Sequence, residues 1–234
     1  MRRLLTTCLV TLALAGCEIQ TVPVPAPSGG TAPTEVARRT GSGVGLGDFR
    51  VVVDRVEPVA EAACRERTGS TNCDFAIFVE ESDVANAFQT YNRRGQPVIV
   101  FTTGLFGEMR NRDELAFALA HEAAHHIRGH IEQTNRSAQT GALLGVLAGS
   151  LAGLDQQGVS QIADIGGTIG ARRYSKGFEL EADQLGALIT ERAGYDAVRG
   201  VQYFARAADP GDRFLGTHPP NADRIAVVRQ TLGR

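Results

Sequence analysis

The chain has 234 residues, of which 43% are hydrophobic and 21% are charged, and its formal net charge at pH 7 is -2. These proportions are those of a soluble globular protein and exclude a disordered or fibrous chain. The charge balance provides no basic surface for a polyphosphate backbone, so we expect no nucleic-acid partner.

Residues 1–16 have the pattern of a bacterial export signal, in which two arginines precede a short apolar run over residues 4–14. The run is shorter than the roughly 20 residues that span a bilayer, so a permanent membrane helix is not expected. The sequence Leu-Ala-Gly-Cys at 14–17 resembles a lipobox, which predicts that Cys17 carries lipid and anchors a periplasmic protein to the membrane. The alternative is an ordinary signal peptide with an incidental cysteine. Glu18 stands where the inner-membrane retention signal has Asp, which favours the outer membrane.

The rest of the chain divides into a tether and one domain. Residues 17–47 are rich first in Pro and then in Gly, a composition that extends or stays flexible. Residues 48–234 are enough for a single domain of ordinary size. Within it, Cys64 and Cys73 form the remaining cysteine pair, which in an oxidising periplasm predicts a disulfide. Two buried free thiols are the alternative.

The first half of the domain is expected to combine a helix with short strands. A helix is predicted over residues 49–63. The β-rich runs 75–79 and 98–101 flank the turn-like sequence 92–95, which indicates an antiparallel pair. We expect the second run, continued to Gly104, to be an edge strand to which an extended substrate can add by main-chain pairing, with an ordinary core strand as the alternative.

The second half is expected to be helical. A capping residue at 111 and an acidic residue three positions later begin a helix over residues 111–128, and Gly129 marks its end. Residues 141–154 are apolar and too short to span a bilayer, which indicates a buried or pocket-lining helix. The Gly-rich stretch 141–170 is a candidate cover over the active-site cleft. A further helix is predicted over 178–193, and helices with a small antiparallel or mixed sheet make the fold α+β.

The positions of the histidines are the strongest indication of the chemistry of this protein. Four of the five lie between positions 121 and 130, and the fifth is His218. His121 and His125 are four apart on the predicted helix, so both imidazoles can reach one ion. Glu122 lies beside them, where its carboxylate can take a proton from an activated water. Imidazole nitrogens suit zinc, and this spacing therefore predicts a catalytic zinc site, with a solvated helix face as the alternative.

A third ligand has to come from elsewhere in the chain. His126 and His130 are expected to turn away from the ligand face and to have helix-end or surface roles. Glu179 and Asp183 are four apart on the predicted later helix, so one carboxylate can bind metal while the other orients a ligand imidazole. Spacing alone leaves Glu181 open as the ligand.

These motifs resemble the gluzincin family of HtpX-type and CAAX prenyl protease-type peptidases, which have His-Glu-x-x-His followed by Glu-x-x-x-Asp. The resemblance covers roughly residues 84–225, and includes the segments 98–105, 114–120 and 217–220. It implies a mostly helical, zincin-like domain with one zinc ion per chain. The roles that it implies fall on five residues: His121, His125 and Glu179 as zinc ligands, Glu122 as general base, and Asp183 as the partner of a ligand imidazole.

The resemblance also implies that His218 reaches the site from the C-terminal side. With Arg224 nearby in sequence, His218 is a candidate for stabilising the tetrahedral oxyanion. It can instead be a fourth zinc ligand that holds the enzyme in a resting state, or a turn residue held by the prolines that follow. Sequence does not choose among these roles.

The expected function is that of a small periplasmic lipoprotein branch of the family. We expect a zinc-dependent endopeptidase that cleaves misfolded or misassembled envelope proteins, with the outer-membrane assembly machinery as a partner. A non-catalytic chaperone or assembly factor that uses the same cleft is the rival hypothesis, and the intact Glu122 argues against it. A purely structural zinc would need a closed site with four protein ligands.

Overall fold

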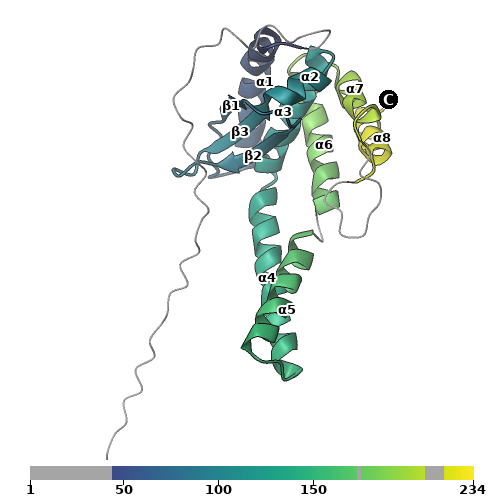
Figure 1. Ribbon diagram of the computed structural model, residues 1–234. Coiled ribbons are helices and arrows are strands. Elements are labelled where there is room, and N and C mark those ends of the chain that lie inside the picture. The colour runs from purple at the N-terminus through teal and green to yellow at the C-terminus, as the bar shows by residue number, and fades with distance from the viewer. Residues whose placement is uncertain (1–43, 173–174, 209–218) are drawn as a thin grey trace, which may run out of the picture. The chain divides into compact units, whose positions relative to one another are not determined.

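The computed structural model describes residues 44–172, 175–208 and 219–234 (Figure 1). The predicted signal, the lipid site, most of the tether and His218 lie outside the described residues. The described part consists mainly of helices with one small three-stranded sheet, which confirms the α+β prediction. None of the described helices combines the length and the apolar character that a bilayer crossing requires.

Helix α1, Leu46–Arg67, extends beyond the predicted 49–63 at both ends. Its apolar residues recur every three or four positions, and the face that they form is buried in the core, with Val52 and Val56 fully inaccessible. At its C-terminal end, Cys64 forms a disulfide with Cys73, which confirms the predicted pairing. The bond ties the end of α1 to the segment that leads into the sheet.

The sheet contains β1 (Ala76–Glu80), β2 (Ala87–Tyr91) and β3 (Pro97–Thr102) in the order β1-β3-β2. β1 is parallel to β3, so the predicted antiparallel pairing of the runs 75–79 and 98–101 is wrong. The turn at 92–95 joins β3 to β2, a strand that the sequence analysis missed, and these two strands are antiparallel. β2 has few of the branched apolar residues that identify strands, whereas β3 is a nearly continuous apolar run, as expected of a central strand.

This topology also corrects the expected substrate edge. β3 is paired on both sides, and Thr103 and Gly104 begin the short helix α2, Thr103–Glu108, rather than ending a strand. Within the described residues, the edge strand that contacts α3 (Arg112–Ile127) is β2. Any strand added at the edge beside α3 must therefore pair with β2.

Helix α3 begins as the sequence predicts. The Asn111 side chain accepts the backbone N–H of Glu114 at 3.1 Å. The Glu114 carboxylate accepts the N–H of Arg110 and is paired with Arg206. Eleven residues of α3 are buried, because it contacts α1, the sheet and the C-terminal helices. The helix that carries the metal-binding motif is therefore held on several sides.

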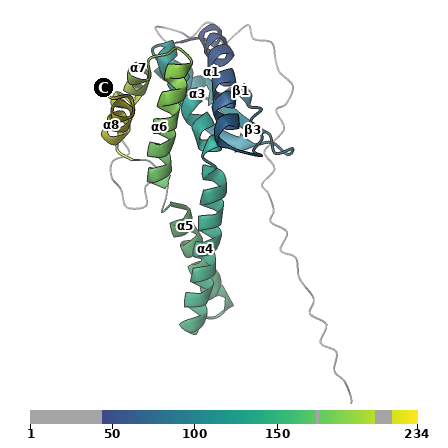
Figure 2. The same ribbon diagram turned by 180° about the vertical axis from the view of Figure 1, so that it is seen from behind.

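The apolar stretch after α3 belongs to a helical hairpin of α4, His130–Leu151, and α5, Gln156–Arg172, which lie side by side (Figures 1 and 2). Glycines allow their backbones to approach: a Cβ on Gly145 would lie 2.4 Å from the carbonyl oxygen of Ile162. The leucines of α4 are exposed, Leu151 by 81%. The expectation of a buried helix is therefore wrong. The alternative of a pocket-lining helix is confirmed, because residues of this stretch and of α5 line a pocket, among them Gly141, Leu144, Gly145 and Ala148.

The C-terminal elements are α6 (Ser175–Arg192), α7 (Ala197–Gly200), the 3-10 helix η2 (Val201–Ala205) and α8 (Asn221–Leu232). α6 confirms the helix predicted over 178–193. It lies between α3 and α8 (Figure 2). A Cβ on Gly186 would lie 3.1 Å from the Cα of His121, so the backbones of α6 and α3 are in close contact beside the histidine motif.

Candidate active site

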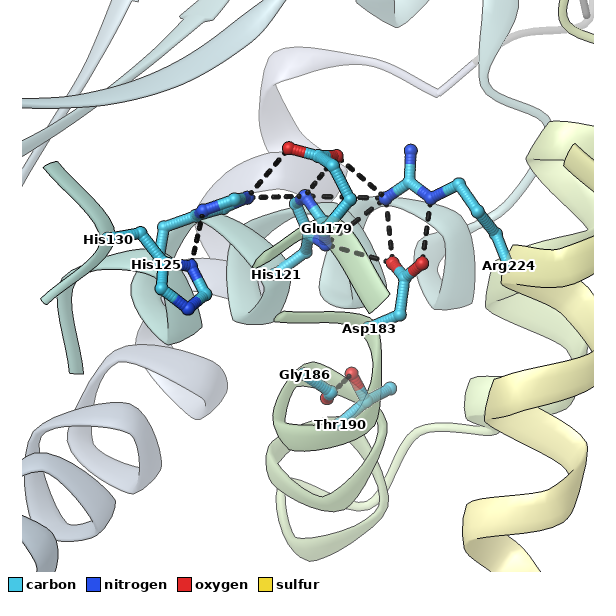
Figure 3. Close-up of polar contacts among 8 residues, drawn as sticks. All are labelled: His121, His125, His130, Glu179, Asp183, Gly186, Thr190 and Arg224. Carbon is cyan, nitrogen blue, oxygen red and sulfur yellow. Dashed lines mark hydrogen bonds and ion pairs between the residues drawn. The ribbon is translucent and has the colours of Figure 1, made fainter. Parts of the chain in front are cut away.

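The three predicted ligands meet where α3 and α6 face each other (Figure 3). The Nε2 atoms of His121 and His125 are 3.0 Å apart. The two carboxylate oxygens of Glu179 lie 3.5 Å from His121 Nε2 and 3.3 Å from His125 Nε2. Each side chain offers one ligand atom to a group whose atoms all lie within 4.8 Å of one another.

This donor set fits zinc in chemistry and in size. Two imidazole nitrogens and a carboxylate are ligands that zinc binds in catalytic sites, with a fourth position left for water or substrate. Tetrahedral bonds of about 2.0–2.1 Å place two ligand atoms about 3.4 Å apart. The three observed separations of 3.0, 3.3 and 3.5 Å lie around that value.

A buried ion pair orients the first imidazole. His121 Nδ1 lies 2.9 Å from Asp183 Oδ1, so its N–H can donate to this carboxylate and leave Nε2 free for a metal. Asp183 is completely buried and accepts two hydrogen bonds of 2.7 Å from Arg224. The Arg224 guanidinium lies 3.7 Å above the ring of Phe204 and 3.6 Å from Glu179. The arginine therefore balances the negative charge of both carboxylates.

The surroundings raise the pKa values of His121 and Glu122. Burial and Arg224 lower the pKa of His121, but hydrogen bonds to Asp183 and Glu179 outweigh them and raise it to about 9. Burial raises the pKa of Glu122, against the opposing effect of the two motif histidines. A carboxylate with a raised pKa accepts a proton more readily, as a general base must.

A cleft of about 450 Å³ lies beside these residues. Its lining includes Glu122 and the three candidate ligands, and further residues come from β2 and η2: Ala87, Phe88, Gln89, Tyr203 and Phe204. The sequence analysis missed this second set, because only the fold brings the β2 edge and η2 to the motif. No residue of 141–170 is among the described lining residues, so the expected cover is not found there.

Both neighbouring histidines are buried, so the expected surface role is wrong. Both do lie at helix ends, His126 in the last turn of α3 and His130 at the start of α4. His126 joins α3 to the sheet, with Nδ1 3.0 Å from the Tyr91 hydroxyl and Nε2 2.7 Å from the carbonyl oxygen of Asn72. His130 Nδ1 lies 2.9 Å from Nδ1 of the motif residue His125. Burial, followed by repulsion from His125, lowers the pKa of His130 to about 3.

The expectation that His130 lies far around the helix is wrong, because the helix does not continue through Gly129. This residue has φ +66, a left-handed conformation that favours glycine, and it separates α3 from α4. The break brings His130 back to the ligand side. Gly129 before His130 was the available signal in the sequence.

The structure also distinguishes the acidic residues that spacing left open. Glu181 is half-exposed, with its carboxylate 3.6 Å from His130 Nε2, and it does not belong to the group that could hold a metal. Glu179 is the carboxylate that faces both motif imidazoles. His218 lies outside the described residues, so its predicted roles stay predictions.

The model of Peptidase family M48 matches residues 50–232 of the chain. The chain belongs to this family. M48 peptidases are metalloproteases, so the chain is a metallopeptidase, and the matched region contains α3, α6 and the group that could hold a metal. No curated protein matches the chain.

Proposed function

We propose that this M48 peptidase is a zinc-dependent endopeptidase of the bacterial envelope that cleaves misfolded or misassembled periplasmic and outer-membrane proteins. One observation carries the catalytic part of the proposal: His121, His125 and Glu179 converge at a cleft that Glu122 also lines. The donor set fits zinc, and the general base is in reach of the same space.

Each residue then has a definite part in hydrolysis. His121, His125 and Glu179 would hold the ion, and bound zinc supplies Lewis-acid activation of a water molecule and of the scissile carbonyl. Glu122 accepts the water proton and passes it to the leaving amine. Arg224 Nη1 has no hydrogen-bond partner among the described residues, and with His218 it is a candidate for stabilising the oxyanion.

The cleft suits an unfolded substrate. Among the described strands β2 pairs only with β3, so its other edge is available for main-chain hydrogen bonds, and Ala87, Phe88 and Gln89 line the cleft. The Oε1 atom of Gln89 is buried and has no hydrogen-bond partner among the described residues, so it can accept an N–H from an extended peptide. Main-chain pairing demands an extended segment and no particular sequence, which agrees with misfolded clients.

Sequence features support the location. The export signal and Cys17 favour a lipid-anchored periplasmic protein, and Glu18 favours the outer membrane. The disulfide between Cys64 and Cys73 agrees with an oxidising compartment. At such a membrane the outer-membrane assembly machinery is the partner that we propose.

Glu122→Gln tests the catalytic assignment. We expect cleavage of an unfolded model protein to fall about 10²–10⁴-fold, because the amide cannot accept the water proton. Metal analysis should still find one zinc per chain, since Glu122 is not in the proposed ligand set. The matched control is Glu80→Gln, at an exposed carboxylate at the end of β1, which should cleave at the wild-type rate. Wild-type cleavage by Glu122→Gln would refute the assignment.

The same variant separates the peptidase from the chaperone hypothesis. We expect Glu122→Gln to fail to restore the envelope phenotype of a strain that lacks the protein. Full complementation by this variant would show that holding clients, and not cleaving them, is the function.

A further inference from the structure

We propose that His130 is a positioning residue of the metal site, which fixes the tautomer and orientation of His125 through a hydrogen bond between their Nδ1 atoms. The proposal rests on the proposed metal site. His130 is the first residue of α4, only 3% of it is exposed, and its Nδ1 is 2.9 Å from His125 Nδ1 (Figure 3).

The direction of this hydrogen bond follows from metal binding. His125 presents Nε2 to Glu179 and His121, so this nitrogen must keep its lone pair for the metal. A neutral imidazole carries one proton, which therefore stands on His125 Nδ1 and is donated to His130 Nδ1. His130 must then carry its own proton on Nε2. That atom points toward the carboxylate of Glu181 at 3.6 Å and has no hydrogen-bond partner among the described residues.

Packing holds His130 in this position. Its ring stacks on Phe178 with the ring centroids 4.4 Å apart and the planes 12° apart. Phe178 immediately precedes Glu179, so His130 contacts one metal ligand directly and lies against the neighbour of another. The left-handed conformation of Gly129 is what turns His130 toward them.

The two motif histidines are thus supported in different ways. His121 donates to the carboxylate of Asp183, the usual partner of a metal-binding imidazole. His125 has a second imidazole as its acceptor. Because His130 is also the first residue of α4, this contact connects the N-terminal end of the α4–α5 hairpin to the metal site.

Zinc binding to the purified protein tests the proposal with the metal alone as probe. His130→Phe keeps an aromatic ring against Phe178 but removes the acceptor, and we expect zinc affinity in a chelator competition to fall about 10–100-fold. His130→Asn keeps an acceptor near the Nδ1 position and should retain affinity within about threefold, far less than the loss of a partner to a ligand. The matched control is His126→Phe, at an equally buried histidine of α3 that contacts no proposed ligand, and it should bind zinc like the wild type.

A measurement on the unaltered protein covers the case in which His130→Phe does not fold. In ¹⁵N spectra of the zinc-bound wild type, we expect His125 to be protonated at Nδ1 and His130 at Nε2. The opposite tautomer of His130, undiminished zinc affinity in His130→Phe, or an equal loss in His126→Phe would overturn the proposal. A wild type that binds no zinc would instead refute the proposed function.

Discussion

At the scale of single residues, Asp183 and Arg224 form a buried ion pair beside His121. Asp183 is completely inaccessible and 5% of Arg224 is exposed, so neither charge is stabilised by water. The two 2.7 Å hydrogen bonds and the contact with His121 compensate for that loss. The pair therefore supports the fold and orients a candidate ligand at the same time.

Asp183→Asn tests the contribution of this ion pair to the stability of the fold. Removing one partner of a buried ion pair leaves the other charge uncompensated, and we expect the free energy of unfolding to fall by about 3–5 kcal/mol. Urea denaturation measures the change. The comparison is Glu66→Gln, which removes a solvent-screened, exposed ion pair with Arg192 and should lower the free energy of unfolding far less. Equal losses in the two variants would contradict the importance of burial.

The raised pKa of His121 predicts that pH acts in opposite directions on two quantities, the stability of the metal-free protein and its affinity for zinc. In the metal-free protein the folded state holds the His121 proton more tightly than the unfolded state does, with a pKa of about 9 against 6.5. The resulting stability is fully present below pH 6.5 and is lost as the pH rises through 9. Zinc needs the neutral imidazole, so its affinity should increase over the same interval.

Thermal unfolding at pH 6 and pH 9 measures the change in stability, and chelator competition at the same pH values measures the change in zinc affinity. We expect the metal-free protein to melt at a higher temperature at pH 6, and zinc to bind more tightly at pH 9, with release of a proton. Zinc affinity that does not change between these pH values would contradict the protonation of His121 in the metal-free site.

At the scale of elements, the α4–α5 hairpin depends on glycine for its helix contact. A methyl group on Gly145 would lie 2.4 Å from a backbone oxygen of α5, which cannot move like the end of a side chain. The leucines of α4 are each more than half exposed, so they form no buried layer between the two helices. Close backbone approach, and not a layer of large side chains, therefore holds the hairpin together.

Gly145→Ala should separate α4 from α5. We expect faster amide hydrogen exchange throughout 130–172, because the methyl group forces the two backbones apart. Gly107→Ala is the matched control: it makes the same change in a helix where nothing lies within 4 Å of the added Cβ, and it should be neutral or slightly stabilising. Unchanged exchange in Gly145→Ala would show that the close contact is not required.

At the scale of the whole molecule, the cleft is assembled from segments far apart in the sequence. Its lining comes from the β2 edge, α3, the start of α6, η2 and α8. We propose that lipid on Cys17 holds the same molecule at a membrane. Recognition of an extended chain and attachment to the envelope are then properties of separate parts of the chain.

The proposed attachment predicts the fate of Cys17→Ser. Without the acceptor thiol no lipid can be added, so we expect the protein to move from the membrane fraction to the soluble periplasmic fraction. Cys8→Ser is the matched control, because Cys8 is removed with the predicted signal, and it should stay in the membrane fraction. Membrane retention of Cys17→Ser would refute lipid anchoring.

The sequence by itself determined the features that depend on local spacing or on counting. A four-residue interval places His121 and His125 on one helix face whatever surrounds the helix, and the cap at Asn111 fixes where that helix begins. The cysteine pair followed from the number of cysteines and the expected compartment. These inferences needed no knowledge of distant contacts.

Only the tertiary structure decided the features that depend on contacts between segments. The parallel pairing of β1 with β3 and the exposure of the α4 leucines each depend on which elements meet. Spacing left both Glu179 and Glu181 open, and the packing of α6 on α3 places Glu179, the residue that the family resemblance implies, beside the motif histidines. The position of His130 depends on the backbone conformation at Gly129, which glycine permits but does not impose. Residue type limits what a segment can do, and the neighbouring elements select among those possibilities.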